Sequence, residues 1–268
     1  MKGRVLIVAG SDSSGGAGIQ ADIKTVTALG GYAATAITAV TVQNTQGVTG
    51  VHGIPPDVVA AQMRAVLSDI GADVVKIGML HAAAIIDAVA DVLMQDAVKI
   101  PVVLDPVMIA KGGHPLLEPA AETGLRRRLM TFAYVLTPNI PEAEALTGAK
   151  IVNADDMERA AHNLKTFGPK AIMVKGGHLP GGEVTDVLLD DRGSAFRFTG
   201  KRIDTPHTHG TGCTLASAIA TGLAQGMSIR ESVVRARAYV LKAIKTAPGY
   251  GHGHGPLNHG HTVGPFEG

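Results

Sequence analysis

Short apolar segments rich in β-branched residues alternate with segments of helical periodicity along most of the 268-residue chain, and this alternation constrains the fold more than any other feature. A strand, a helix and a further strand form the repeating unit of parallel sheets whose faces are covered by helices. We therefore predict an α/β fold, with a doubly wound, mainly parallel sheet and helices on both faces. No Pro/Ser-rich linker interrupts the pattern, so residues 1–268 are expected to form one domain.

The spacing of apolar residues gives the expected elements. Strands are predicted at residues 5–9, 33–42, 74–77, 101–104, 134–136 and 171–174, and an antiparallel pair at 184–189 and 194–198. Helices are predicted at residues 18–29, 57–70, 82–94, 118–130, 141–146, 155–167, 211–225 and 229–246. Asp155 is the expected N-cap of its helix.

Polar and glycine-rich motifs follow six of these strands directly. They occupy residues 11–18, 43–45, 78–79, 105–107, 137–139 and 175–177. Ligands of open α/β sheets bind at the carboxyl ends of the strands. We therefore expect these motifs to line one rim of the sheet.

The segment from Thr208 to Thr214 places two glycines, Gly210 and Gly212, just before the only cysteine, Cys213, and a helical pattern follows at once. Free backbone N–H groups at a helix N-terminus favour an anion. A thiol at such a position is expected to have a lowered pKa. The alternative is a glycine-rich turn that carries an inert, buried cysteine.

The loop at residues 10–18 joins a strand to a helix, but it is neither a dinucleotide-binding fingerprint nor a P-loop. No glycine lies between Gly10 and Gly15, and no Lys-Ser/Thr pair follows the glycines. The loop is expected either to cradle a small molecule or to serve as a flexible turn. Asp22, four residues after Gly18, is expected on a solvated helix face or as a partner of the helix dipole.

Five further residues at the predicted rim have side chains suited to chemistry. The Gln43 amide suits the edge of a nitrogen heterocycle, and Met79 suits a flat ring, although core packing is its commoner use. Asp105 and Glu142 suit Mg²⁺ beside phosphates, with helix capping as the alternative for the stretch from Asn139 to Glu142. A cation at a strand end, Lys175, suits a phosphate.

Composition excludes several classes of protein. The net charge of +1, the 3% aromatic content and the absence of Trp argue against a nucleic-acid partner. A single cysteine excludes an internal disulfide framework and fits a reducing compartment. Because the chain opens on a strand-like segment and holds no apolar run of transmembrane length, we expect a cytoplasmic protein with no membrane partner.

Four histidines alternate with glycine near the C-terminus: His252, His254, His259 and His261. They lack strict metal-ligand spacing, so we expect this segment to fold over an edge or to make a subunit contact rather than to bind a metal.

Together the motifs resemble those of the ribokinase-like small-molecule kinases, and most closely those of the hydroxymethylpyrimidine/phosphomethylpyrimidine kinase family of thiamine biosynthesis. The resemblance covers about residues 4–260 and rests on short motifs that are specific only in combination. They lie at residues 9–22, 43–45, 76–79, 104–108, 137–142, 175–178, 208–214 and 253–259.

The resemblance implies phosphorylation of 4-amino-5-hydroxymethyl-2-methylpyrimidine by ATP, a second phosphorylation to the diphosphate, and a homodimer. On the substrate side, Gln43 would read the aminopyrimidine edge, and Gly10, Ala17, Asp22 and Met79 would shape the pocket.

On the phosphate side, the resemblance implies roles for eight residues. Lys175 and Asn139 would meet the nucleotide phosphates, and Asp105 and Glu142 would support Mg²⁺, partly through water. The anion hole would be formed by Gly210, Thr211, Gly212 and Cys213.

Most ribokinase-like enzymes carry an Asp, the usual general base, where this chain carries Cys213. The acceptor of the second phosphorylation is a phosphate monoester, which has a second pKa of about 6 and is already ionised. Our hypothesis is that Cys213 matters more for the first phosphorylation than for the second.

Three other functions remain open on sequence grounds. Pyridoxal kinase activity, alone or as a second function, uses the same primary-alcohol chemistry. A binding or regulatory domain that has lost catalysis is disfavoured by the glycines of the anion hole, Lys175 and Asp105. A dinucleotide oxidoreductase is disfavoured by the spacing of the glycines in residues 10–18.

Overall fold

The computed structural model describes residues 1–109, 113–114, 116–118, 121–264 and 267. They form a nine-stranded sheet in the order β3-β2-β1-β4-β5-β6-β7-β8-β9. The strands are β1 (Arg4–Asp12), β2 (Tyr32–Asn44), β3 (Gly47–Gly53), β4 (Val74–Ile77), β5 (Val102–Leu104), β6 (Ala133–Leu136), β7 (Ala171–Val174), β8 (Glu183–Leu189) and β9 (Ala195–Lys201). Strands β2, β1, β4, β5, β6 and β7 run parallel, whereas β3, β8 and β9 are antiparallel to their neighbours.

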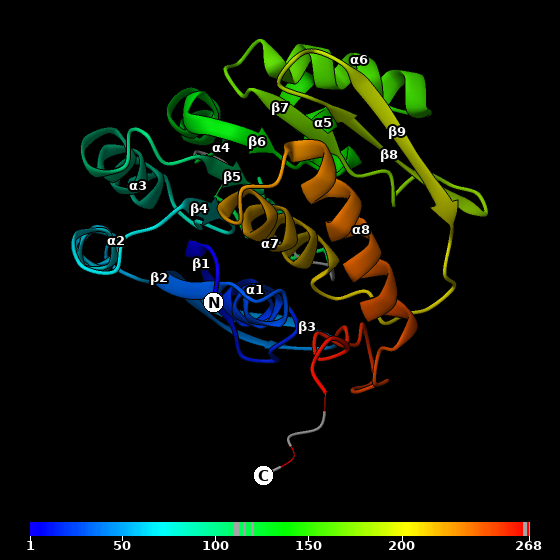
Figure 1. The fold of residues 1–268 in the computed structure, drawn as a ribbon, viewed down its shortest axis with the longest axis horizontal. Coiled ribbons are helices and arrows are strands. Elements are labelled where there is room, and N and C mark those ends of the chain that lie inside the picture. The colour runs from blue at the N-terminus through cyan, green and yellow to red at the C-terminus, as the bar shows by residue number, and fades with distance from the viewer. Residues whose placement is uncertain (110–112, 115, 119–120, 265–266, 268) are drawn as a thin grey trace.

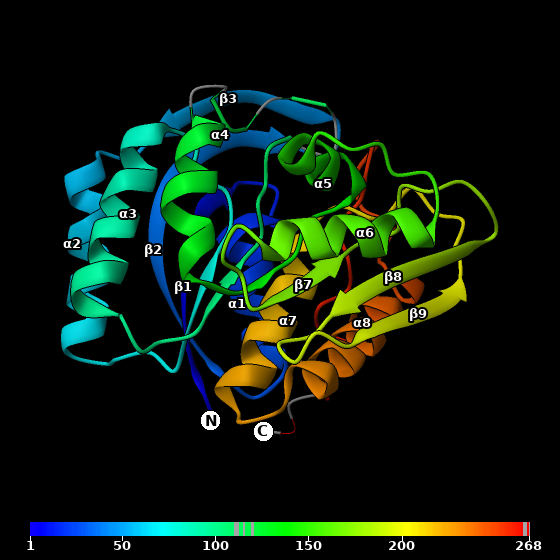
Figure 2. The same ribbon diagram turned by 90° about the horizontal axis from the view of Figure 1, so that it is seen from above.

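Helices cover both faces of the sheet (Figures 1 and 2). On one face lie α2 (Pro56–Ser68), α3 (Ala83–Asp96), α4 (Ala121–Gly124), α5 (Ile140–Thr147) and α6 (Ala154–Lys165). On the other face lie α1 (Gly18–Ala28), α7 (Thr211–Ala224) and α8 (Ile229–Lys245). The predicted fold class is therefore confirmed.

The continuous apolar sequence of β1 matches its position in the sheet, where helices cover both faces. Leu6 and Val8 belong to the core beneath α2 and α3, while Val5, Ile7 and Ala9 belong to the core beneath α1 and α7. Successive side chains of a strand point to opposite faces, so a continuous apolar run suits a strand that is buried on both sides. The order of the sheet reverses at β1, because β2 lies on one side of it and β4 on the other. Such a reversal places a binding crevice at the carboxyl end of the strands.

Three predictions of local structure differ from the structure. Strand β3 was not predicted, because its sequence, Gly-Val-Thr-Gly-Val-His-Gly, is rich in glycine and has little apolar content. The helix predicted at 118–130 includes residues 119–120, which lie outside the described residues, and α4 continues as a π-helical turn (Leu125–Leu129) and a 3₁₀ turn (Met130–Phe132). Asp155 does not cap α6. The cap is Asn153, whose side chain accepts a hydrogen bond from the backbone N–H of Asp156.

The C-terminal histidine segment contacts the turn between β2 and the edge strand β3, which agrees with the first of the two alternatives expected for it, folding over an edge. The backbone N–H of His254 donates to the carbonyl of Thr45 in the β2–β3 turn at 2.8 Å. Residues His209 and Pro256 form an isolated parallel bridge. His259 is buried, and its Nε2 lies 2.9 Å from Oγ1 of Thr214 in the first turn of α7. No group of His, Cys, Asp and Glu within the described ranges is arranged to hold a metal ion. Nor does the described chain contain a helix long and apolar enough to cross a membrane.

The His259 contact predicts a pH dependence of stability. Burial, followed by the positive charges of Lys24 and His261, lowers the pKa of His259 from 6.5 to about 4. Between these two pH values the unfolded chain therefore binds more protons than the folded chain. The contribution of neutral His259 to the free energy of unfolding is lost as the pH falls from about 6.5 to 4. In urea titrations, the free energy of unfolding of the wild type should fall by up to about 3 kcal/mol more than that of His259→Gln over this range. If the free energy of unfolding had the same pH dependence in the wild type and in His259→Gln, the lowered pKa of His259 would be contradicted.

Candidate active site

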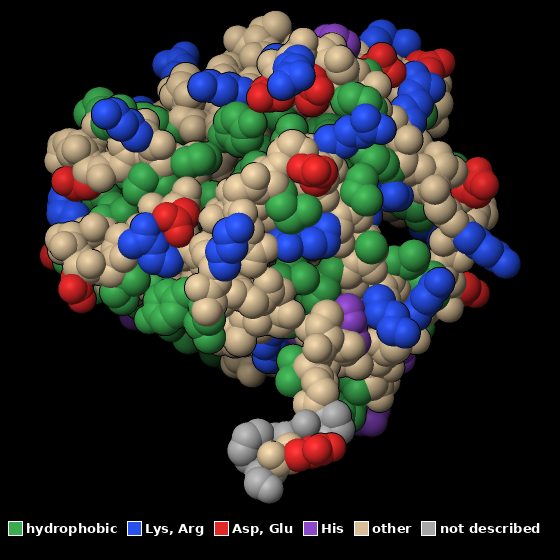
Figure 3. Space-filling model, viewed as in Figure 1, with side chains coloured by type: hydrophobic (Ala, Val, Ile, Leu, Met, Phe, Trp, Pro, Cys, Tyr) green, Lys and Arg blue, Asp and Glu red, His purple; other side chains and the backbone are tan. Residues whose placement is uncertain are grey.

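A cavity of about 1240 Å³ lies at the carboxyl ends of the parallel strands. Residues from the ends of β1, β2, β4, β5, β6 and β7 line it, as do the first turn of α7 and one side of α8. Figure 3 shows the surface hollowed beside α8, between this helix and the segment that follows β9. Of the residues predicted for the site, the lining includes Gly10, Ala17, Gln43, Met79, Asp105, Asn139, Glu142, Lys175, Gly210, Thr211, Gly212 and Cys213.

The turn before α7 brings the backbone N–H groups of the helix start to this cavity, although that of Thr211 also donates to the carbonyl of Thr208 at 3.4 Å. Gly210 has φ of 83°, a left-handed conformation that favours glycine, and a Cβ there would collide with the carbonyl oxygen of Gly16. Among the described residues, no side chain caps the helix that starts at Thr211. The first-turn N–H groups and the helix dipole therefore favour an anion in the cavity.

A lysine and two carboxylates lie next to this helix start. Lys175 Nζ lies 2.7 Å from Asp105 Oδ1 and 3.9 Å from Glu142 Oε2. A Cβ on Gly212 would lie 3.3 Å from Lys175 Nζ and 3.6 Å from Asp105 Oδ2, which shows how closely the three approach. Burial opposes the charge of Lys175, but Asp105 and Glu142 raise its pKa above the usual range. The cavity thus holds a cation beside the anion-favouring turn.

Asn139 and Glu142 form a capping box at the start of α5. Asn139 Oδ1 accepts from the N–H of Glu142 at 2.9 Å, and Glu142 Oε2 accepts from the N–H of Asn139 at 2.8 Å. The capping alternative is therefore confirmed for this pair. Burial, together with the charge of Asp105, raises the pKa of Glu142 to about 7 despite the opposing effect of Lys175. Because both residues also line the cavity, capping does not exclude a role towards a ligand.

Cys213 differs from its sequence-based expectation. Its side chain is half-buried at the cavity wall, and burial raises the pKa of the thiol to about 12. Lys76 and the backbone N–H of Gly18 act in the opposite direction, and Asp22 and Asp105 raise the pKa further. The predicted lowering is wrong because desolvation and these carboxylates outweigh the favourable position at a helix N-terminus.

Asp22 also differs from its expectation. It is neither on a solvated helix face nor among the cavity-lining residues, because it is fully buried beneath the cavity floor. Its Oδ2 lies 2.8 Å from Nζ of the fully buried Lys76, and its Oδ1 accepts from the hydroxyl of Ser217 in α7 at 2.7 Å. Burial opposes the charge of Lys76, but Asp22, Cys213 and Asp105 raise its pKa, so the lysine stays protonated.

Sequence reasoning assigned no role to Lys76, although a signal was present. A lysine within an otherwise apolar central strand, Val74–Ile77, must find a buried partner, and an Asp on the first helix is such a partner.

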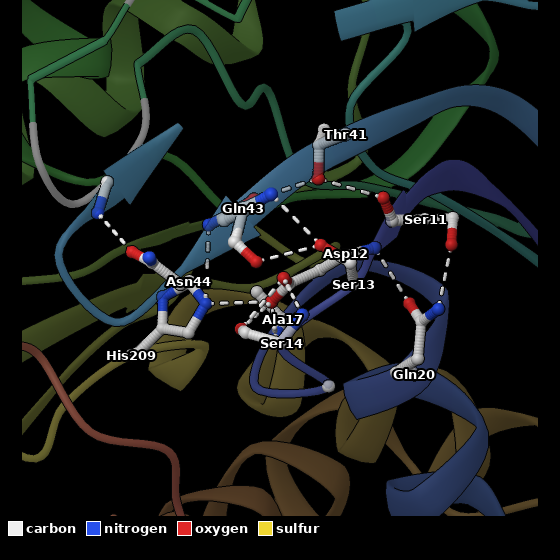
Figure 4. Close-up of polar contacts among 12 residues, drawn as sticks. Ser11, Asp12, Ser13, Ser14, Ala17, Gln20, Thr41, Gln43, Asn44 and His209 are labelled. Atoms are coloured by element: carbon white, nitrogen blue, oxygen red, sulfur yellow. Dashed lines mark hydrogen bonds and ion pairs between the residues drawn. The ribbon is translucent and has the colours of Figure 1, made fainter. Parts of the chain in front are cut away.

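Asp12 and His209 were missed as well. They meet beside Gln43, where His209 Nε2 lies 2.8 Å from Asp12 Oδ2 (Figure 4).

On the same side of the cavity, Gly10 and Met79 are in tight contact. A Cβ on Gly10 would lie 2.9 Å from Met79 Sδ, and the carbonyl of Met79 is held by the hydroxyl of Thr38 at 2.6 Å. The cavity therefore has two unlike ends: one carries amides, a lysine and carboxylates, and the other carries an amide side chain and a thioether.

Comparison with known proteins agrees with this arrangement. The model of the phosphomethylpyrimidine kinase family matches residues 12–258. The chain belongs to the phosphomethylpyrimidine kinase family. Among curated members, it is 46% identical over 261 residues to a hydroxymethylpyrimidine/phosphomethylpyrimidine kinase of Streptomyces coelicolor, covering 97% of this chain and 95% of the relative. It is 54% identical over 259 residues to the thiamine biosynthesis bifunctional protein ThiED of Geobacter sulfurreducens, which covers 96% of this chain but only 52% of that longer protein.

Solved structures include kinases of two kinds. A phosphomethylpyrimidine kinase from Clostridium difficile is 44% identical with a TM-score of 0.80, over 91% of this chain and all of that chain. A pyridoxal kinase from Bacillus subtilis, solved as an ADP complex, is 35% identical with a TM-score of 0.88, over 97% of this chain and 98% of that chain. The fold is thus shared by phosphomethylpyrimidine kinases and pyridoxal kinases.

The buried pair beneath the cavity predicts a large and specific loss of stability. Burial raises the pKa of Asp22, and Lys76 is the main group that opposes this. Replacing Lys76 with Met leaves the buried carboxyl without its partner, so that it must either stay charged or take up a proton, which should cost about 3–5 kcal/mol in the free energy of unfolding measured in urea. The double variant Lys76→Met/Asp22→Asn should recover part of this loss because it removes the unpaired charge. The control is Arg64→Met, which breaks an exposed ion pair with Asp96 and should cost less than about 1 kcal/mol. Equal losses in Lys76→Met and Arg64→Met would contradict the importance of the buried pair.

Proposed function

We propose that the protein transfers the γ-phosphoryl group of ATP to the hydroxymethyl oxygen of 4-amino-5-hydroxymethyl-2-methylpyrimidine, and then phosphorylates the monophosphate to the diphosphate, as a step of thiamine diphosphate biosynthesis. The observation that carries the proposal is the convergence of the turn before α7, Lys175 and Asp105 at one end of a cavity whose other end holds Gln43 and Met79. The relatives of nearly equal length that are named for this pair of activities support it.

In the proposed reaction, the hydroxymethyl oxygen forms a bond to the γ-phosphorus while the bond from that phosphorus to the bridging oxygen breaks. ADP leaves, and the hydroxymethyl proton passes to a base, a role that we propose for the thiolate of Cys213. Catalysis of this kind rests mainly on positioning and on charge stabilisation. The N–H groups of Gly210, Thr211, Gly212 and Cys213 would bind the transferred phosphoryl oxygens, and the buried charge of Lys76 supports the same place from below.

Lys175 and Asn139 would contact the nucleotide phosphates. Asp105 and Glu142 fit Mg²⁺, since this ion is commonly held by one or two carboxylates, by substrate phosphates and by water. When bound, Mg²⁺ would neutralise phosphate charge. For the carboxylates to take part, Lys175 would exchange its contact with Asp105 for one with phosphate oxygens.

At the other end, Gln43 would read the aminopyrimidine edge, and Gly10, Ala17 and Met79 would shape the pocket around the ring. Asp22 would act from beneath by holding Lys76. We further propose that the 268 residues form one kinase domain that acts as a cytoplasmic homodimer and has no nucleic-acid or membrane partner.

A second candidate, pyridoxal kinase activity, is favoured by the solved pyridoxal kinases with TM-scores of 0.87 to 0.89. These chains are 34–35% identical to this one, whereas curated pyrimidine kinases reach 46–47% over similar coverage. The pyrimidine is therefore the better-supported substrate.

A coupled ADP-release assay over a panel of hydroxymethyl heterocycles, with products resolved as mono- or diphosphate, tests the proposal. With ATP and Mg²⁺, kcat/KM for the aminopyrimidine alcohol should exceed that for pyridoxal by about tenfold or more, because hydrogen bonds left unpaired in the pocket penalise the wrong ring. The diphosphate should follow the monophosphate in time. A preference for pyridoxal would overturn the assignment, and ATP binding without turnover of any alcohol would favour a binding domain.

A further inference from the structure

Asp12, His209 and Gln43 form a polar cluster beside the proposed pyrimidine end of the cavity, and the reaction described above assigns no role to Asp12 or His209. Asp12 ends β1, Gln43 lies near the end of β2, and His209 directly precedes the turn before α7 (Figure 4). All three residues line the cavity, but Asp12 and His209 are buried, whereas Gln43 is partly exposed. The cluster therefore connects a buried acid to a residue that faces the ligand.

The hydrogen bonds around Asp12 determine which atom of His209 carries a proton. The Asp12 carboxylate accepts from the N–H and hydroxyl of Ser14 and from the N–H of Ala17 at 2.8–3.0 Å. Burial opposes ionisation, but the hydrogen bonds from His209 and Ser14 outweigh it and lower the pKa of Asp12. An ionised carboxylate only accepts hydrogen bonds, so His209 Nε2, 2.8 Å from Asp12 Oδ2, must be a donor.

The same reasoning determines the orientation of the Gln43 amide. In the structure, the nitrogen of this amide lies 3.4 Å from His209 Nε2, and its oxygen lies 3.1 Å from the hydroxyl oxygen of Thr41 (Figure 4). The nitrogen and oxygen of an amide are assigned from their hydrogen-bond partners. The single hydroxyl hydrogen of Thr41 has a backbone acceptor, the carbonyl of Ser11 at 3.0 Å. With the amide nitrogen towards His209, two donors would face each other. With the amide oxygen towards His209 and the nitrogen towards Thr41, the amide nitrogen donates to the Thr41 oxygen. The single Nε2 hydrogen of His209, whose main acceptor is Asp12, is then shared with the amide oxygen in a three-centre hydrogen bond.

We propose that His209, held by Asp12, is a positioning residue that fixes the Gln43 amide in one orientation and thereby sets the specificity of the cavity for 4-aminopyrimidines over 4-oxopyrimidines. That the ligand is a pyrimidine is taken from the proposed function, on which this inference rests. With His209 and Thr41 on its two sides, the amide keeps one N–H donor and one oxygen lone pair for a ligand, in a fixed order.

The order matters because the two pyrimidines have nearly the same shape and opposite hydrogen-bonding patterns. A 4-aminopyrimidine offers a donor at its amino group and an acceptor at N3. The 4-oxo form offers an acceptor at its oxygen and a donor at N3–H. An amide that turns freely matches either ring, whereas an amide fixed by His209 matches only one.

The test compares the affinities of 4-amino- and 4-oxo-5-hydroxymethyl-2-methylpyrimidine by titration calorimetry without ATP. His209→Asn is too short to reach Gln43, so the ratio of the two affinities should fall by about tenfold or more from that of the wild type. In His209→Gln, the side-chain nitrogen replaces Nε2 and is held by the Asp12 acceptor, so the ratio should stay within about threefold of the wild type. The control is His162→Asn, on the exposed surface of α6, which should leave the ratio unchanged.

Thr41→Val provides a second route should His209→Asn fail to fold. It removes the acceptor on the other side of the Gln43 amide with little change in shape, and it should lower the ratio in the same direction. Equal losses of affinity for both rings, with an unchanged ratio in the folded variants, would overturn the inference. Turnover is measured separately with ATP. A wild type that discriminates between the rings but phosphorylates neither would contradict only the proposed function.

Discussion

The fully buried ion pair of Lys76 and Asp22 is the interaction on which the candidate site depends. It joins a central strand, β4, to α1, and the hydroxyl of Ser217 joins the same carboxylate to α7. The elements that carry the loop after β1, the cavity floor and the turn before α7 are therefore held by one charged contact. Removing two charges from water is costly, and an ion pair alone is weak support for stability. Its consequence for the site is a lysine that stays protonated, lines the cavity and interacts electrostatically with Cys213 and Asp105.

The parallel sheet explains how residues distant in the chain reach one cavity. Asp105, Asn139 and Lys175 each follow a separate strand, and parallel strands place their carboxyl ends along one edge. The close contact of Gly210 with Gly16 then brings the start of α7 against the loop after β1. The two ends of the cavity, proposed for phosphates and for the ring, thus share a wall, since His209 touches Asp12 and precedes Gly210 directly.

Much of the fold was predictable because continuous apolar runs and helical apolar periodicity are local properties of the chain. The cavity-lining motifs were predictable because they follow strands. The errors arose where tertiary contacts decide. Strand β3 exists through pairing with β2 rather than through its own apolar content. The interpretation of Asp22 failed because its partner is 54 residues away in the chain, and that of Cys213 because its surroundings outweigh the helix N-terminus. His209 gave no local signal, since Asp12 lies 197 residues before it.

The central claim is that backbone amides and buried positive charge serve both phosphorylations, while Cys213 serves chiefly the step whose acceptor is an alcohol. A thiol pKa raised to about 12 leaves little thiolate at neutral pH, but such thiolate as forms is a strong base. The most direct measurement is the rate of each phosphorylation in Cys213→Ala, started separately from the alcohol and from its monophosphate. The account predicts a loss of about a hundredfold for the alcohol, the size of a general-base contribution, and less than about tenfold for the monophosphate. Equal losses in the two steps would contradict it.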